Sequence, residues 1–153
     1  MSPRQRRIVQ AVCYEAIAIA VVGPLLSAAF GEGLSSSMAL AALLSAIALA
    51  WNYVFNGLFE HWETRQPTRT RTLRRRLWHG IGFEGGLGPL LVPVMAWWLQ
   101  ISLLAALLAD LGLLVFFFFY AIGFTWAFDR LFGPPLSARE PASAPSAAAA
   151  AEP

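Results

Sequence analysis

The chain has 153 residues, of which 58% are apolar and only 13% are charged. Soluble domains average about 45–50% apolar and about 25% charged residues, so the composition excludes an ordinary soluble domain. The single cysteine, Cys13, excludes an intrachain disulfide. All 11 basic residues are arginines. We therefore predict an integral membrane protein and no nucleic-acid partner.

Four stretches are long and apolar enough to cross a bilayer, which takes about 20 residues for roughly 30 Å of hydrocarbon. Because irregular backbone would leave polar groups unsatisfied in lipid, we predict four transmembrane helices. These helices are expected over residues 8–30, 37–59, 77–99 and 104–128. Residues 133–153 are rich in proline, alanine and serine, which predicts a disordered tail.

The arginines predict the orientation of these helices. None lies in the turns after the first and third stretches, whereas all lie before the first, between the second and third, or after the fourth. Arginine gathers on the cytoplasmic side of membrane proteins, so both termini and the middle loop are predicted to be cytoplasmic. The basic loop suits the anionic headgroups of the lipid bilayer, which we favour over nucleic acid as its partner.

A shift of 69 residues aligns the two halves of the chain without a gap. It places Glu15 on Glu84 and Glu60 on Asp129, and rare carboxylates do not readily align by chance. Each half holds two spans, so both halves enter the membrane in the same sense, as a parallel repeat. The predicted fold is an all-α membrane bundle of two helix pairs, residues 4–64 and 73–132.

Glu15 is the first candidate functional residue. It lies about 10 Å inside the first span, at 1.5 Å per residue, and no arginine lies within a helical turn. A charged side chain at such depth costs at least ~2.5 kcal/mol. A carboxyl group in this position can hold a proton or a cation, which is what coupling proton flux to cation movement requires. The alternative is a protonated contact between helices, which we disfavour because alanine or serine would pack at lower cost.

Glu84 is either a second protonation site or a polar contact between the halves. Asp110 is either a first-turn acid stabilised by the helix dipole or a cation site. For His79, an interfacial position is favoured over a proton relay.

A polar stripe of Asn52, Asn56 and Glu60 at spacings of four runs beside Trp51. It either lines a substrate path, with aromatic faces for cation–π contacts, or joins helices. At the cytoplasmic ends of the spans, where charges are readily solvated, we expect Glu60 and Asp129 to be structural.

The sequence has no phosphate-binding loop, nucleotide motif or nucleophilic set, and its two histidines and one cysteine are too few for a zinc site. We therefore predict no enzyme, no cofactor and no metal, and expect an ion gradient to supply the energy for any transport.

Four motifs together resemble those of the proteobacterial antimicrobial compound efflux (PACE) family, over roughly residues 4 to 132. The motifs are Arg7-x-x-Gln10-x-x-x-Tyr14-Glu15, Trp51-Asn52-x-x-Phe55-Asn56-x-x-Phe59-Glu60, Arg76-x-x-His79-x-x-x-Phe83-Glu84-Gly85-Gly86 and Phe124-x-Trp126-x-Phe128-Asp129. The start of the fourth span, Asp110-x-Gly112, resembles the family as well. Gln10 departs from the family pattern, which often has histidine there, and the tail matches nothing in it.

The resemblance implies a homodimeric inner-membrane pump that exports hydrophobic cationic biocides such as chlorhexidine, acriflavine or quaternary ammonium compounds, or short diamines, by proton antiport. It maps the family's essential glutamate onto Glu15 and its aspartate of the fourth span onto Asp110. We expect a site made of Glu15, Glu84, Asp110, Asn52, Asn56, Trp51 and Tyr14, with possible support from His79, Glu60 and Asp129. The alternatives are a non-transporting scaffold or assembly protein that uses these residues to join helices, and a passive channel.

Overall fold

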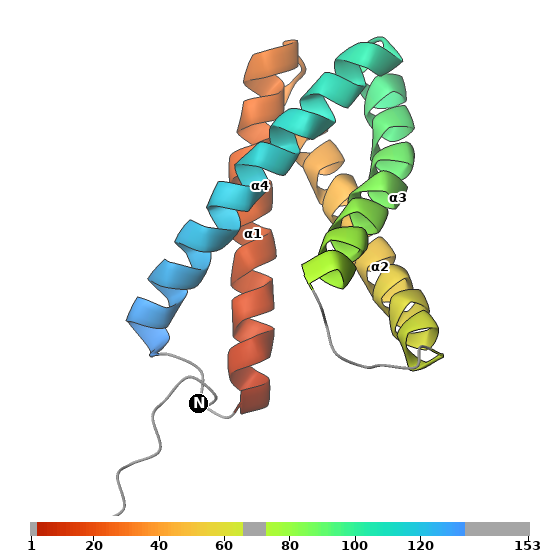
Figure 1. The fold of residues 1–153 in the computed structure, drawn as a ribbon. Helices are drawn as coiled ribbons and strands as arrows, with labels where there is room; N and C mark the ends of the chain where they lie inside the picture. The colour runs from red at the N-terminus through yellow and green to blue at the C-terminus, as the bar shows by residue number, and fades with distance from the viewer. Residues whose placement is uncertain (1–2, 66–72, 134–153) are drawn as a thin grey trace, which may run out of the picture.

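The computed structural model describes residues 3–65 and 73–133, so the predicted tail lies outside the described residues except for Gly133. Within these ranges the chain forms four α-helices and no strand (Figure 1). This confirms the predicted all-α membrane fold, although the helices extend beyond the predicted spans at the arginine-rich end. The helices are α1 (Pro3–Phe30), α2 (Leu34–Thr64), α3 (Leu73–Leu99) and α4 (Leu103–Phe132).

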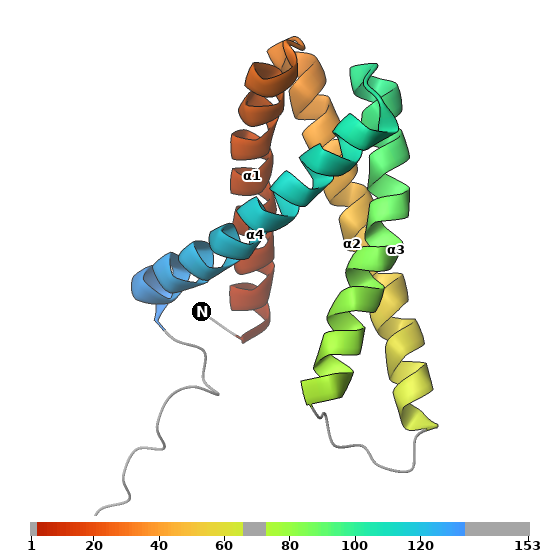
Figure 2. The ribbon, with the colours of Figure 1, turned by 45° about the horizontal axis from the view of Figure 1, so that its top comes forward.

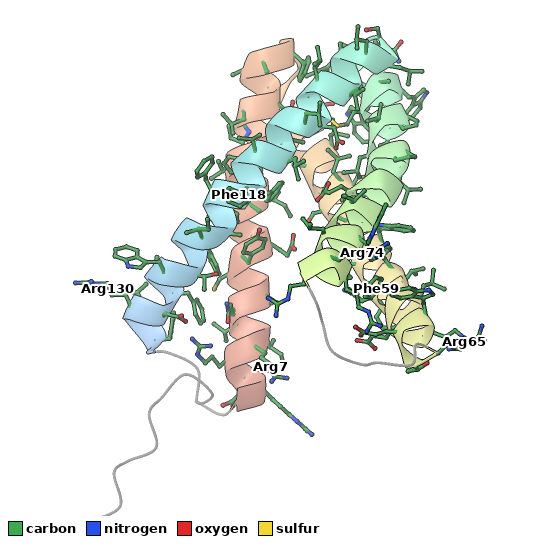
Figure 3. All side chains as sticks on the ribbon, viewed as in Figure 1. Arg7, Phe59, Arg65, Arg74, Phe118 and Arg130 are labelled. Carbon is green, nitrogen blue, oxygen red and sulfur yellow. The ribbon has the colours of Figure 1, made fainter. Side chains whose placement is uncertain are left out.

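The helices alternate in direction. The α1–α2 and α3–α4 turns lie together at one end of the bundle, and the start of α1, the α2–α3 link and the end of α4 lie at the other (Figures 1 and 2). Figure 3 labels Arg7, Arg65 and Arg130 near that second end. Helices α1 and α3 therefore run in one sense and α2 and α4 in the opposite sense, as a parallel repeat requires.

Helices α1, α2 and α4 are each long and apolar enough to cross a membrane, whereas α3 is less apolar. The difference arises because α3 carries His79, Glu84 and several glycine, proline and tryptophan residues. With 27 residues, α3 is about 40 Å long, which exceeds the hydrocarbon thickness. Because α2 and α4 run in the same sense, the chain must cross back between them, and α3 is the described helix that does so.

The hydrophobic core lies towards the end that holds the two turns. It joins side chains from all four helices: Val22, Leu26, Leu40, Ala41, Leu44, Leu91, Met95, Leu99 and Ala106. Gly31 ends α1 in the left-handed region at φ +72°, where glycine is favoured, and its N–H donates to the Ser27 carbonyl at 2.9 Å. Ser102 caps α4 by accepting a hydrogen bond from the Ala105 N–H at 3.1 Å. Packing and capping together close this end of the bundle.

At the arginine-rich end, each odd-numbered helix binds the even-numbered helix of the other half. Arg6 in α1 forms an ion pair with Asp129 in α4 at 2.5 Å. Arg75 in α3 lies 4.0 Å from Glu63 in α2. The two arginines occupy equivalent positions in the repeat. The halves are therefore joined by contacts of the same kind on both sides of the bundle.

Candidate functional site

A cavity of about 260 Å³ lies between the four helices and is lined by residues from each of them. Three carboxylates face it, those of Glu15, Glu84 and Asp110, which we call the cavity carboxylates. Asn52 and Tyr14 also line it. Among the described residues, no arginine or histidine lines this cavity. The rest of its wall is largely aliphatic and includes Ile19, Val22, Leu44, Leu87, Leu91 and Leu113.

Glu15 is half-buried on α1 and is held by the neighbouring helix of its own half. The hydroxyl of Ser45 on α2 donates a hydrogen bond to Glu15 Oε2. Ser45 itself lines the cavity, so the bond fixes the carboxylate at the cavity wall. The partner recorded for Glu15 in the described part of the chain is therefore a neutral hydroxyl and not a basic side chain.

Glu84 on α3 and Asp110 on α4 are the two cavity carboxylates that come from the second half of the chain. A Cβ atom at Gly88, one helical turn beyond Glu84 on α3, would lie 3.5 Å from Asp110 Oδ2. The two carboxylates therefore belong to the same side of the α3–α4 pair. Asp110 lies eight residues after the α4 cap, Ser102, and no acidic residue lies in the first turn of α4. The interpretation of Asp110 as a first-turn acid is therefore wrong, because the helix-dipole effect falls off within that turn.

The predicted polar stripe on α2 divides into parts with different environments. The Asn56 amide donates to Asn52 Oδ1, and Asn56 Oδ1 lies 2.9 Å from His79 Nε2 on α3. Asn56 thus connects α2 to α3, whereas Asn52 reaches the cavity. The His79 ring packs edge-on against Phe59, with centroids 4.7 Å apart. Glu60 is exposed on α2.

The two aromatic residues of the predicted site lie on different surfaces. Tyr14 lines the cavity. Trp51 instead faces α3, where its Nε1–H donates to the Phe83 carbonyl at 3.0 Å. Its ring covers Gly86 so closely that a Cβ atom there would overlap the indole. Asp129, predicted as polar support, pairs with Arg6 at 2.5 Å and so joins α4 to α1.

Sequence reasoning missed Ser45 and Tyr120. Ser45 is a small residue among many in an apolar helix, and nothing in the sequence marks it as the partner of Glu15. Tyr120 donates from its hydroxyl to the Tyr14 carbonyl at 2.8 Å. The repeat aligns Tyr120 with Trp51, so the 69-residue shift was a signal that could have found it.

The profile of the chlorhexidine efflux transporter family matches the chain twice, over residues 2–65 and 71–134. The chain belongs to this family. The resemblance to the PACE family is thereby confirmed, and the match takes in all four helices and every residue of the cavity wall. Members of this family are membrane transporters, and the apolar helices of this PACE protein suit a bacterial membrane.

Several relatives of this PACE protein are named short-chain diamines transporters. The protein from Vibrio parahaemolyticus is 43% identical over 129 residues, covering 84% of this chain and 91% of the relative. Those from Acinetobacter baylyi and Acinetobacter baumannii are 33% and 32% identical over 127 residues, each covering 83% of this chain and 89% and 88% of the relative. No solved structure matches the chain. In residues 3–65 and 73–133, no group of three or more His, Cys, Asp or Glu side chains is arranged to hold a metal ion.

Proposed function

We propose that this PACE protein is a proton-coupled antiporter that exports small cations across the bacterial inner membrane, with both termini in the cytoplasm. The observation that carries the proposal is that the cavity carboxylates come from both halves and face one space without an arginine or histidine in its described wall. Such a space attracts cations, because ion pairing offsets the cost of keeping carboxylates charged in a membrane.

Among cations, short-chain diamines are the substrates we favour. A diamine carries an ammonium group at each end, and the cavity offers Glu15 from one half and Glu84 with Asp110 from the other. The aliphatic wall between them suits a methylene chain. A volume of about 260 Å³ is slightly below the ~300–1,000 Å³ of sites for drug-sized ligands, so a short diamine suits it better than a biocide with several rings. Larger hydrophobic cations would require the helices to separate.

The transport cycle follows from the charge of the site. Deprotonated carboxylates bind the cation from the cytoplasm or the inner leaflet, while the packed core closes the end with the two turns. Rearrangement opens the site towards the outside. Protons then neutralise the carboxylates, starting with Glu15, and the cation leaves. A bundle of four helices is small for such a rearrangement, so we propose that the pump works as a homodimer.

The test uses Glu15→Gln, which removes the charge while keeping the size of the side chain. Purified protein in liposomes with an imposed pH gradient is assayed for diamine efflux and for proton movement. We expect Glu15→Gln to abolish both while the wild type couples them. The matched control is Glu32→Gln in the α1–α2 turn, outside the cavity wall, which should transport as the wild type does. Full proton-coupled efflux by Glu15→Gln would refute the proposal, and diamine flux without proton movement in the wild type would indicate a passive channel.

A further inference from the structure

Two hydrogen bonds between the halves are equivalent in the repeat. The Tyr120 hydroxyl on α4 donates to the backbone carbonyl of Tyr14 on α1 at 2.8 Å. The Trp51 indole N–H on α2 donates to the backbone carbonyl of Phe83 on α3 at 3.0 Å. The 69-residue shift places Trp51 on Tyr120 and Tyr14 on Phe83. Each even-numbered helix therefore donates a hydrogen bond to the odd-numbered helix of the other half. The two donors occupy equivalent positions in the repeat, and so do the two acceptor carbonyls.

The aromatic rings beside these bonds repeat in the same register. Tyr14 packs edge-on against Phe124 on α4, with centroids 5.1 Å apart and an interplanar angle of 87°. Phe83 packs edge-on against Phe55 on α2, at 5.6 Å and 75°. Phe55 aligns with Phe124 under the same shift. The hydrogen bonds and the ring contacts thus both follow the 69-residue repeat, although the two donors, an indole and a phenol, are chemically different.

The acceptor carbonyls belong to the residues immediately before Glu15 and Glu84. A helical carbonyl already bonds an N–H four residues on, but its oxygen has a second lone pair for another donor. The additional bond fixes the depth and rotation of that helical turn relative to the other half. Each acceptor residue and the glutamate that follows it both line the cavity, so the bond is made to the backbone one residue before the cavity carboxylate.

We propose that Tyr120 and Trp51 are positioning residues that hold Glu15 and Glu84, respectively, at the cavity wall. Neither residue lines the cavity, so each acts through the glutamate beside its acceptor. Gly86 supports this role on the Trp51 side, because only glycine leaves room there for the indole. The inference rests on the proposed function of the two glutamates in cation binding.

The test observes the two carboxyl groups directly by infrared difference spectroscopy of the purified protein between acid and neutral pH. The carboxyl C=O stretching band lost in Glu15→Gln belongs to Glu15, and the band lost in Glu84→Gln belongs to Glu84. Tyr120→Phe removes only the hydroxyl and should shift the Glu15 band alone. Trp51→Phe should shift the Glu84 band alone.

Gly86→Ala places a methyl group on α3 where the Trp51 indole now lies, so the indole must move. This variant should therefore shift the Glu84 band as Trp51→Phe does. The controls are Tyr53→Phe and Trp78→Phe, which alter exposed rings on α2 and α3 and should leave both bands in place. Tyr120→Phe should also weaken diamine binding by about fivefold, the effect of roughly 1 kcal/mol of hydrogen bonding.

Shifts of both bands in each variant, or of neither band in Tyr120→Phe, would overturn the proposal. If Trp51→Phe fails to fold by circular dichroism, the Tyr120→Phe result decides it alone, because that variant keeps its aromatic ring. The bands report the carboxyl groups whether or not the protein transports anything. Suppose that Tyr120→Phe shifts only the Glu15 band and Trp51→Phe only the Glu84 band, but the wild type shows no proton-coupled efflux. That result would reject the proposed function and support the positioning role.

Discussion

Asp110→Asn tests whether the cavity recognises two positive charges at once. The substitution keeps the shape of the side chain and removes one negative charge from the second-half side of the cavity. A diamine should then lose part of its attraction at one end, whereas a monoamine of the same chain length can still pair with Glu15. We expect diamine affinity to fall while monoamine affinity changes by less than about fivefold, which corresponds to less than about 1 kcal/mol.

The size of the diamine effect follows from the contacts. A hydrogen bond to a charged group contributes about 1.5–3 kcal/mol, which corresponds to a change in affinity of about 10-fold to about 150-fold. Glu84 lies on the same side of the cavity and retains its carboxylate. The remaining charge should hold the loss near the lower end of this range, at about tenfold. Asp110→Asn combined with Glu84→Gln should reach the upper end.

The assay is isothermal titration calorimetry of the purified protein with a diamine and with the monoamine of equal length, at neutral pH. Circular dichroism establishes that the variants are folded, and Glu32→Gln serves as a control that removes a carboxylate outside the cavity. Equal losses for the two amines in Asp110→Asn would refute recognition of two charges. So would a diamine affinity equal to that of the wild type.

Arg6→Gln should lower the free energy of unfolding in detergent by about 1–2 kcal/mol, because the partly buried ion pair with Asp129 is lost. Thermal unfolding measures this, and Arg130→Gln, at an exposed arginine on α4, should have little effect; equal stability of the two variants would contradict the role of the ion pair. Diamine affinity should fall as pH falls, because a proton on any cavity carboxylate competes with an ammonium group. Calorimetry across pH would contradict this if the affinity stayed constant, or if it fell more steeply for the monoamine than for the diamine.

The number, order and direction of the helices could be predicted because hydrocarbon imposes strict requirements. A chain must satisfy its backbone internally, and arginine is confined to one side. The same cost of burying charge made Glu15 and Glu84 visible as candidates, and the structure places both at one cavity. The depth of Asp110 was harder to judge, because it depends on where α4 begins and how the helix crosses its neighbours.

The pairing of helices across the halves was not predictable from apolar periodicity. In a membrane, both the lipid-facing and the packed faces of a helix are apolar, so hydrophobicity does not distinguish them. Phe117 lines the cavity, whereas Phe118 is 62% exposed on the outside of α4, within one unbroken run of phenylalanines. The contact of Ser45 with Glu15 could not be predicted either, because the apolar pattern of α2 does not show which of its faces packs against α1. The repeat carried more information, since it relates Tyr120 to Trp51 before any contact is known.

The contacts between the halves keep the symmetry of the repeat, but the charges in the cavity do not. Ala41 and Asp110 occupy equivalent positions, as do Ser45 and Leu114, and all four line the cavity. The first half thus presents one carboxylate with a hydroxyl, and the second presents two carboxylates. In the proposed cycle, a proton on Glu15 removes the negative charge that the first half contributes to the described cavity wall, whereas Glu84 and Asp110 still hold the other end of a diamine. Under the proposed function, a symmetric diamine would therefore meet an asymmetric site, and a single protonation at Glu15 would be enough to begin its release from one end.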